Sequence, residues 1–443
     1  MTPAARVSAA IAILADLEVR RRPVNDALRE WGQTHRFAGS RDRAAVATLV
    51  YDALRRRASA ASLLGGDSPR AVVLGMLRLG RGLEADDIAR LFSGERFAPE
   101  ALTADERGRL EAPPPDMSAP AAGDFPDWLE EPLTRAFGDD LIAEMQALAD
   151  RAPIDIRVNT LKTSREALAE ALAHLSPETT PLAPDGLRFH VDADGRGPAL
   201  QAEPEFIQGL FEVQDEGSQL ASRLTLAAPG EQVIDLCAGA GGKTLALAAQ
   251  MDNRGQIYAT DIDAQRLAAI HARLERSGAR NVQLRVPRGR YDPVRRPEVA
   301  DPLADLAASA DLVLVDAPCT GTGTWRRNPD AKWRLRPGAL KERMNDQAVV
   351  LDRAAGLVKP GGRIAYVTCS LLPAENDDAI TAFLERHDEF SILSAEDVCR
   401  QAGLPDLAPC ATAAGGLLLT PHRTETDGFY VAVLSNGTTG AAG

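Results

Sequence analysis

Apolar residues in the first part of the chain recur at the three- and four-residue spacing of amphipathic helices. The segments 26–31 and 41–54 follow this spacing, and Ser40 is a suitable N-cap for the second of them. The same spacing relates Ala5, Val7, Ala10, Ile11, Ile13 and Leu14. We therefore expect residues 1–95 to form a small all-helical domain.

Residues 96–127 interrupt this pattern. Six prolines lie there among Ala, Gly and Asp, which is typical of a linker. Beyond the linker, 133–149 and 164–175 have helical spacing, whereas 154–159 alternates like a strand. We expect residues 128–205 to form a small α+β subdomain.

From residue 206 onward, short apolar runs alternate with helical segments, which is typical of an α/β fold with a parallel sheet. The expected strands are 232–236, 256–260, 282–286, 312–315 and 363–368, followed by 417–420 and 429–434. We expect residues 206–436 to form a Rossmann-like domain around a seven-stranded sheet.

The composition fits a soluble, cytoplasmic protein. Of the 443 residues, 45% are hydrophobic and 26% are charged, and no apolar run is long enough to cross a membrane. The start of the chain lacks a signal-peptide pattern, and five scattered cysteines argue against a disulfide framework. The histidines do not pair with cysteines at zinc-site spacing, so we expect no metal.

The net charge of −13, taken alone, counts against a nucleic-acid partner. Its distribution weakens this objection, because residues 1–80 hold thirteen arginines against seven acidic residues. A second basic cluster runs from Arg285 to Arg343. Binding to phosphates depends on such local patches. A solvated surface is the alternative explanation of these arginines.

A glycine-rich loop follows the first expected strand of the α/β domain. It reads Asp-Leu-Cys-Ala-Gly-Ala-Gly-Gly-Lys-Thr at 235–244, and its glycines allow a ligand to approach the backbone. The next strand ends at Asp261, where a carboxylate can accept hydrogen bonds from two ribose hydroxyls. Loop and acid together indicate a nucleoside-binding site at the carboxyl edge of the sheet.

Three kinds of ligand could bind this loop: a nucleoside triphosphate, a dinucleotide or S-adenosylmethionine. A P-loop requires glycine where this chain has Cys237, and a dinucleotide loop requires glycine where it has Thr244. S-adenosylmethionine carries no phosphate and tolerates a looser loop. A glycine turn that binds no ligand is the remaining alternative.

Two cysteines lie just past the ends of neighbouring expected strands. Asp-Ala-Pro-Cys-Thr-Gly-Thr-Gly occupies 316–323, and Thr-Cys-Ser occupies 368–370. Cys319, Cys369 and the carboxylate of Asp316 would then face one crevice, where α/β sheets bind ligands. The alternative is that both thiols are small buried hydrophobic groups, as free cysteines often are.

Such a set of groups suits methylation of carbon 5 of cytosine. That carbon is a poor nucleophile until a thiolate adds to carbon 6 and makes it enamine-like, able to attack a methyl sulfonium. A carboxyl such as Asp316 can hydrogen-bond the ring nitrogen and the exocyclic amine as charge develops. The proton on carbon 5 must then leave, and a second thiol nearby could assist its release.

These motifs resemble, in order and spacing, those of the RsmB/Nop2/Sun family of RNA cytosine-5 methyltransferases. The segments 326–333, 372–376 and 426–429 extend the resemblance. It implies a Rossmann-like methyltransferase domain preceded by a small RRM-like α+β subdomain. The helical region 1–95 resembles, less closely, the NusB-type RNA-binding domain of bacterial members that act on 16S rRNA.

The resemblance also implies roles for individual residues. It implies that Cys369 is the nucleophile and that Cys319 aids product release, whereas DNA cytosine methyltransferases use the Pro-Cys thiol as nucleophile. RNA contacts are implied for the segment 157–162, and we expect them from Arg157, Asn159 and Lys162. The implied cofactor is S-adenosylmethionine, surrounded by Cys237, Ala238, Gly239, Ala240, Gly241, Gly242, Lys243, Asp261 and Asp316.

Two positions depart from the family's pattern. Gly239 and Ala240 stand where Ala-Pro is common, which is a mild change in the same turn. Arg288 stands where an acidic residue usually follows the third strand, near the adenine. We therefore leave position 288 out of the expected site.

The segment 325–336 combines two tryptophans with five basic residues. It could form a wall that stacks bases and binds phosphates through Arg326, Arg327 and Lys332, or it could be a structural loop packed on the sheet.

We expect a monomeric RNA cytosine-5 methyltransferase that acts on 16S rRNA, with tRNA as the alternative substrate. A non-catalytic RNA-binding assembly factor with a relict domain is another class, against which the intact Cys319 and Cys369 argue. A small-molecule or protein methyltransferase is a third class, and it would need no thiol pair.

Overall fold

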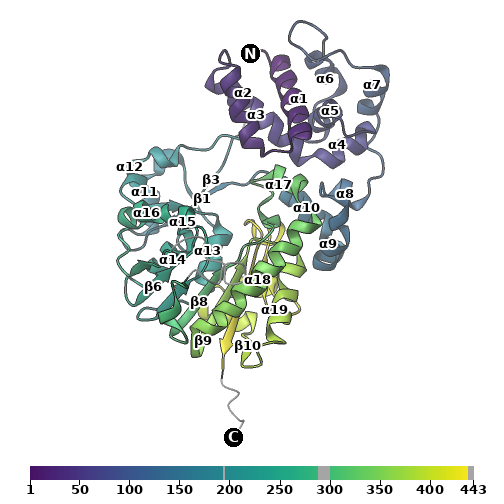
Figure 1. Cartoon of the computed structure of the whole chain (residues 1–443). Helices are drawn as coiled ribbons and strands as arrows, with labels where there is room; N and C mark the ends of the chain where they lie inside the picture. The colour runs from purple at the N-terminus through teal and green to yellow at the C-terminus, as the bar shows by residue number, and fades with distance from the viewer. Residues whose placement is uncertain (193–194, 288–299, 438–443) are drawn as a thin grey trace. The chain divides into compact units, whose positions relative to one another are not determined.

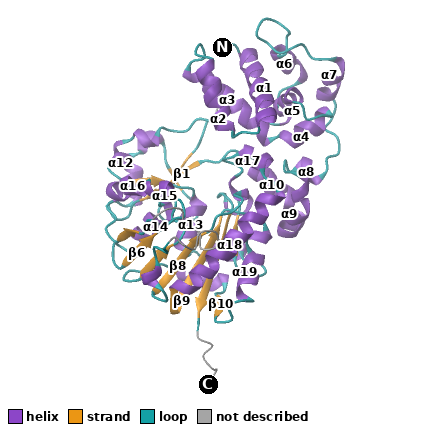
Figure 2. Ribbon diagram, viewed as in Figure 1, coloured by secondary structure: helices purple, strands orange, loops and turns teal. Residues whose placement is uncertain are grey.

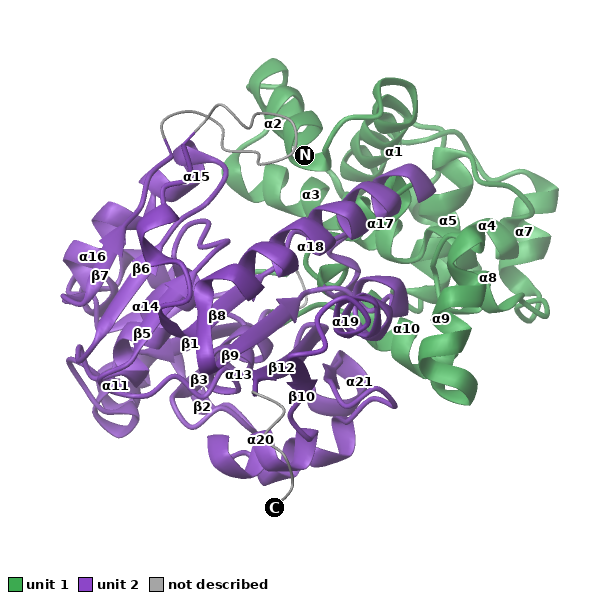
Figure 3. Ribbon diagram, turned by 60° about the horizontal axis from the view of Figure 1, so that its bottom comes forward, with its two compact units in different colours: residues 1–152, 192–196, 324–336 green, residues 153–191, 197–323, 337–443 purple. Residues whose placement is uncertain are grey.

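The computed structural model describes residues 1–192, 195–287 and 300–437. Within these ranges the chain forms two compact units (Figure 3). Unit 1 contains residues 1–152, 192–196 and 324–336, and unit 2 contains residues 153–191, 197–323 and 337–443. Unit 2 carries both cysteine motifs and the glycine-rich loop.

Unit 1 is helical, as expected for the N-terminal region (Figure 2). Buried side chains such as Val7, Val50 and Leu74 form its core. Side chains cap several of its helices: Thr2 accepts a hydrogen bond from the N–H of Ala5, and Ser68 does so from Ala71. Its helices are α1 (Pro3–Arg20), α2 (Val24–Thr34), α3 (Ser40–Arg55), α4 (Arg57–Leu64), α5 (Pro69–Leu79), α6 (Ala85–Leu91), α7 (Ala104–Glu111), α8 (Ala119–Ala122), α9 (Glu130–Phe137), α10 (Leu141–Ala149) and α17 (Pro329–Arg334).

The expected linker at 96–127 is instead part of unit 1. Helix α7 begins with a capping box formed by Thr103 and Glu106, and Leu110 is buried in the helical core. Proline cannot continue a helix but is tolerated in its first turn, so the prolines here mark helix ends. The helices α9 and α10 also group with unit 1, and the strands of the α+β subdomain begin at Ile154.

That subdomain contains an antiparallel sheet in the order β2-β3-β1-β4. Helix α11 (Arg165–Ala171) contributes Leu168 to a core that it shares with Ile156 and Phe211. The last strand lies beyond the expected boundary at 205. The strands are β1 (Ile154–Val158), β2 (Glu178–Thr179), β3 (Gly186–Phe189) and β4 (Phe211–Val213), and a short helix, α12 (Pro204–Ile207), precedes β4.

The larger sheet of unit 2 confirms the expected α/β fold (Figure 1). Its order is β10-β12-β9-β8-β5-β6-β7, with β11 paired to β12. Among the described residues this sheet therefore has eight strands, whereas seven were expected. Strands β5 to β9 run parallel, and β12 runs antiparallel to β9. The strands are β5 (Gln232–Asp235), β6 (Gln256–Ala259), β7 (Val282–Leu284), β8 (Ala310–Asp316), β9 (Val358–Thr368), β10 (Phe390–Ile392), β11 (Leu417–Leu419) and β12 (Phe429–Asn436).

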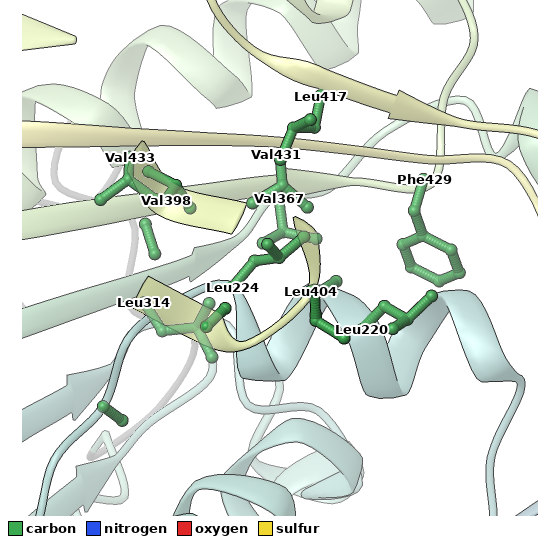
Figure 4. Close-up of a cluster of buried hydrophobic side chains, with 14 of the residues drawn as sticks. Leu220, Leu224, Leu314, Val367, Val398, Leu404, Leu417, Phe429, Val431 and Val433 are labelled. Carbon is green, nitrogen blue, oxygen red and sulfur yellow. The ribbon is translucent and has the colours of Figure 1, made fainter. Parts of the chain in front are cut away.

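Helices pack against this sheet and hold its strands in place. Figure 4 shows Leu224, which directly follows the helix α13 (Glu216–Arg223), beside Val367 of β9, and Leu220 of that helix and Val431 of β12 belong to the same buried cluster. Each such side chain contributes about 1.5–3 kcal/mol when it is buried. The helices of the unit are α13 (Glu216–Arg223), α14 (Gly242–Gln250), α15 (Ala264–Ala268), α16 (Ile270–Ser277), α18 (Pro337–Leu357), α19 (Asp377–Leu384), α20 (Ala395–Ala402) and α21 (Pro421–Thr424).

Candidate active site

The glycine-rich loop joins β5 to α14 in a tight left-handed turn. Gly241 has φ 85°, and a Cβ there would lie 2.3 Å from Cγ1 of Ile270, so only glycine fits. The turn is closed by a 2.8 Å hydrogen bond from the N–H of Gly241 to the carbonyl of Ala238. The turn therefore packs its backbone closely against Ile270 at the carboxyl edge of the sheet.

Two carboxylates lie at this edge, as the sequence predicts. Asp261 is buried, and its Oδ2 accepts a 2.9 Å hydrogen bond from the N–H of Gly239, while Oδ1 accepts one from Asp263. Asp316 ends β8, and its Oδ2 lies 2.8 Å from Nζ of Lys243. The loop and both carboxylates thus belong to one connected set of contacts.

Burial shapes the chemistry of two further groups near the loop. It raises the pKa of Asp235 to about 7, although the hydroxyl of Thr244 donates a 2.7 Å hydrogen bond to this carboxylate. Burial and the nearby carboxylates raise the pKa of the Cys237 thiol well above its usual range. Cys237 therefore stays protonated and is a poor nucleophile.

The structure brings the two motif cysteines into contact. The sulfur of Cys319 lies 3.4 Å from the sulfur of Cys369. The parallel register of β8 and β9, which pairs Asp316 with Val367, places the two following loops side by side. The hydrogen bond to Cys369 and burial raise the pKa of Cys319 well above its usual range. Cys319 therefore holds a proton that it can donate to the sulfur of Cys369.

Two glycines hold the loop of Cys319 against the last motif of the chain. The N–H of Gly323 donates a 2.9 Å hydrogen bond to the carbonyl of Cys369, and the N–H of Gly428 donates one of 2.8 Å to the carbonyl of Gly323. A Cβ on Gly323 would lie 2.2 Å from the carbonyl oxygen of Gly428. This close approach gives a structural explanation for the Thr-Asp-Gly-Phe segment (426–429), whose glycine packs against Gly323.

The residues that fix the Cys369 loop belong to the segment 372–376, which extends the family resemblance but was given no role from the sequence. The amide of Asn376 donates to the carbonyl of Ser370 at 2.8 Å and accepts from the hydroxyl of Thr368 at 2.6 Å. Its neighbour Glu375 is fully buried among polar donors. An acidic residue next to an amide, five residues beyond a Thr-Cys-Ser motif, was the available signal.

Two of the RNA contacts expected in the segment 157–162 are instead buried. Arg157 donates a 2.7 Å hydrogen bond from Nε to Gln214, and burial lowers the pKa of Arg157 to about 10. Nδ2 of Asn159 donates to the carbonyls of Gly209 and Ser277, each at 2.8 Å. These side chains join the small sheet to the α/β part of unit 2. A buried group cannot reach a phosphate, so this expectation was wrong for both.

Lys162 is the one residue among the RNA contacts expected in the segment 157–162 whose side chain is exposed. Its ammonium donates hydrogen bonds to the carbonyls of Gln208 at 2.7 Å and Arg276 at 2.6 Å. The side chain lies at the surface of unit 2 and also braces two backbone segments.

The expected wall at 325–336 packs within unit 1. Lys332 is 3% exposed, and its Nζ lies 5.0 Å from the ring centroid of Trp333 and 3.5 Å from the carbonyl of Arg55. Burial lowers the pKa of Lys332 to about 7. Arg326 is also buried, whereas Arg327 is half-buried. Lys332 and Arg326 are therefore not phosphate contacts here, and the segment, which contains the helix α17, is structural, because Trp333 packs against the helical core of unit 1.

The contact between the two sulfurs predicts a specific oxidation. Diamide should take two hydrogens from Cys319 and Cys369 and leave a disulfide, because the atoms need to approach by little more than an ångström. We expect mass spectrometry to find a peptide pair containing both residues, and dithiothreitol to separate it again. Cys319→Ala should prevent that pair from forming. A pair that links either residue to Cys237 instead would contradict the geometry.

Position 288, where an acidic residue is usual in the family, lies outside the described residues. No group of three or more His, Cys, Asp or Glu side chains in the described ranges is arranged to hold a metal ion. No helix in the part of the chain that the structure describes is long and apolar enough to span a membrane.

Comparison with known proteins bears on this site. The family model described as 16S rRNA methyltransferase RsmB/F matches residues 224–435, and a ferredoxin-like domain model of RsmF/B-like methyltransferases matches residues 125–194. Both cysteine motifs and the glycine-rich loop lie inside the first match. The second match contains three of the four strands of the small sheet.

Two relatives and two solved structures are similar. A Synechocystis protein named probable ribosomal RNA small subunit methyltransferase B is 34% identical over 70% of this chain and 66% of its own length. The Klebsiella pneumoniae ribosomal RNA small subunit methyltransferase B is 33% identical over 70% and 65%. The structure of PH0851 covers 98% of this chain and 99% of its own, with 28% identity and a TM-score of 0.70. A methyltransferase homologue from Pyrococcus horikoshii covers 72% and 97%, with 26% identity and a TM-score of 0.57.

The chain spans just under two thirds of the length of these curated relatives. The two family models follow one another along the chain in the order expected from the sequence, and the relatives share about a third of the aligned residues. The chain therefore belongs to the RsmB/F methyltransferase family.

Proposed function

We propose that this protein is an S-adenosylmethionine-dependent RNA cytosine-5 methyltransferase that acts on 16S rRNA. The observation that carries the proposal is the 3.4 Å contact between the sulfurs of Cys319 and Cys369 at the carboxyl edge of the sheet. Methyl transfer to an oxygen or a nitrogen needs no thiol, whereas transfer to carbon 5 of cytosine needs one to activate the ring.

The residues present fit the cofactor. The turn at Gly239 and Gly241 lies directly after β5, and each carboxylate oxygen of Asp261 accepts one backbone hydrogen bond and has a lone pair left for a ribose hydroxyl. Asp316, which is about one-third exposed, can accept a hydrogen bond from an ammonium group or from the cytosine. S-adenosylmethionine would supply an electrophilic methyl group here.

Side chains of this protein would form and break the bonds to the base. The proton of Cys369 would pass to solvent, and the thiolate sulfur would form a bond to carbon 6 of cytosine as the electron pair of the 5,6 double bond moves toward carbon 5. After carbon 5 has gained its methyl group, Cys319, once its own proton has likewise passed to solvent, would take the proton from that carbon as a thiolate. The electron pair left behind restores the double bond, and the bond between carbon 6 and the Cys369 sulfur breaks.

The substrate is inferred from the relatives and from the predicted need for an unstacked base. Both curated relatives are named for the small ribosomal subunit RNA. A base must leave its stack to reach a thiol at a sheet edge, which favours single-stranded or remodelled RNA. Of the six expected RNA contacts, we retain Lys162 and Arg327, whose side chains are not buried.

Transfer of labelled methyl groups tests the proposal. With tritiated S-adenosylmethionine, label should enter 16S rRNA from cells that lack this protein, and digestion should release it as 5-methylcytidine. Purified tRNA, offered in parallel, distinguishes the alternative substrate. RNA binding without incorporation into either RNA would favour a relict domain, and label found on another base or on protein would overturn the proposal.

A further inference from the structure

One buried carboxylate joins the two loops that carry the thiols. Glu375 ends the 3-10 turn η7 (Pro373–Glu375) and is 0% exposed. Its Oε1 accepts hydrogen bonds from the backbone N–H of Thr320 at 2.8 Å and from Nε2 of Gln347 at 3.0 Å. Its Oε2 accepts hydrogen bonds from the hydroxyls of Thr320 and Ser370. The carboxylate thus receives four hydrogen bonds from three different segments.

The donors include the residues that directly follow the two cysteines. Thr320 comes after Cys319, and Ser370 comes after Cys369. Hydrogen bonds to a carboxylate are about twice as strong as those between neutral groups. Glu375 therefore adds a charged tie to the hydrogen bonds that already join the two loops, from the N–H of Gly323 to the carbonyl of Cys369 and from the N–H of Leu371 to the hydroxyl of Thr322.

Helix α18 fixes the carboxylate from another side. The side-chain amide of Gln347, which is fully buried, donates to the carbonyl of Pro318 as well as to Glu375, each at 3.0 Å. The hydroxyl of Tyr366 on β9 donates a 2.7 Å hydrogen bond to the carbonyl of Glu375. Backbone and side chain of Glu375 are both held, so its position depends on the packed core and not on the loops alone.

We propose that Glu375 is a positioning residue for methyl transfer, which holds the sulfur of Cys319 against the sulfur of Cys369 by binding Thr320 and Ser370 at once. This inference rests on the proposed function. The Glu375 carboxylate with its hydrogen bonds to Thr320 and Ser370 thus forms a clamp between the two loops.

The two halves of the reaction should therefore respond differently to its loss. Attack on carbon 6 needs only the Cys369 sulfur, whereas removal of the carbon 5 proton needs the second sulfur at a defined place. A displacement of about 1 Å can cost about 100-fold in rate. Loss of the clamp should slow release of the product more than formation of the adduct, so that the RNA–protein adduct accumulates.

Glu375→Ala in the full chain tests the clamp. We expect kcat for methyl transfer to fall by about 10- to 100-fold, with KM for RNA and for S-adenosylmethionine changed by less than about 2-fold. A slow-migrating RNA adduct should appear on a denaturing gel. Glu375→Gln should lie between wild type and Glu375→Ala, because its oxygen can still accept from Thr320 and the hydroxyls can turn to accept from its amide.

Glu216→Ala is the matched control for losing a buried carboxylate. Glu216 is also 0% exposed, and its Oε1 accepts hydrogen bonds from the N–H groups of Leu182 at 2.6 Å and Ala183 at 2.7 Å, away from the thiols. Glu216→Ala should lower the amount of folded protein without causing the RNA–protein adduct to accumulate. If Glu375→Ala does not fold, Ser370→Ala removes one of the four hydrogen bonds with little loss of volume and should show a weaker form of the same effect.

Cross-linking separates failure of the clamp from failure of the proposed function. The rate at which diamide joins Cys319 to Cys369 depends on their approach and on no methyl transfer. It should fall by about 5-fold or more in Glu375→Ala, since the clamp no longer holds the loops. An unchanged cross-linking rate would overturn the positioning role even in an inactive protein. Normal adduct turnover in an active Glu375→Ala protein would overturn it as well.

Discussion

Cys369→Ser is expected to reduce methyl transfer to 16S rRNA by a factor on the order of 10⁴ or more. Serine preserves the size of the side chain, but its hydroxyl is a far weaker nucleophile than a thiolate and stays protonated at neutral pH. Cys369 lies on the loop after β9 and is in contact with Cys319, so no other group stands in its place. Incorporation of tritiated methyl groups measures the loss.

Cys399→Ala is the matched control, because Cys399 is a buried core thiol of α20 away from the motif loops. It should retain most of the activity. Binding of RNA by Cys369→Ser should stay within about 2-fold of wild type, since one atom changes. If Cys369→Ser were active and Cys319→Ser inactive, the nucleophile would instead be Cys319, the cysteine of the Pro-Cys motif. Activity in both variants would exclude covalent catalysis through this pair.

The pairing of the thiols could be predicted from sequence because it depends on a local rule. The strands expected at 312–315 and 363–368 are observed as β8 and β9, and they are parallel neighbours. Residues that follow such strands meet at one edge of the sheet. Cys319 and Cys369 needed only this rule to be brought together.

The clamp could not be predicted in the same way. Glu375 meets Thr320 across 55 positions in the sequence, and the contact depends on how the chain turns after Ser370. An isolated glutamate in a sequence is usually an exposed side chain. Only the packed structure shows that this one is buried with four donors.

The basic segment 325–336 shows a different reason why the sequence pattern does not predict the structure. Alternating tryptophan and basic residues are typical of a surface that binds nucleic acid, and we expected one. The indole N–H of Trp333 instead donates a 2.7 Å hydrogen bond to the carbonyl of Leu54, 279 positions away in the sequence. The aliphatic part of a lysine can pack beside such rings, so the pattern of residue types does not distinguish a buried segment from an exposed one.

Cys319→Ala is expected to trap the covalent RNA–protein adduct. Cys369 can still bond to carbon 6 and the base can still be methylated, but the sulfur that lies 3.4 Å away and would take the carbon 5 proton is gone. Turnover should fall by a factor of about 10² to 10⁴. With labelled RNA and S-adenosylmethionine, the adduct should appear as a slow band on a denaturing gel.

The double variant Cys319→Ala/Cys369→Ala should show no band, which would assign the bond to the Cys369 sulfur. The band should be stronger in Cys319→Ala than in Glu375→Ala, because the first change removes the base and the second only displaces it. Normal turnover in Cys319→Ala, without any band, would show that another group removes the proton. The contact between the sulfurs would then protect or orient Cys369 and would not release the product.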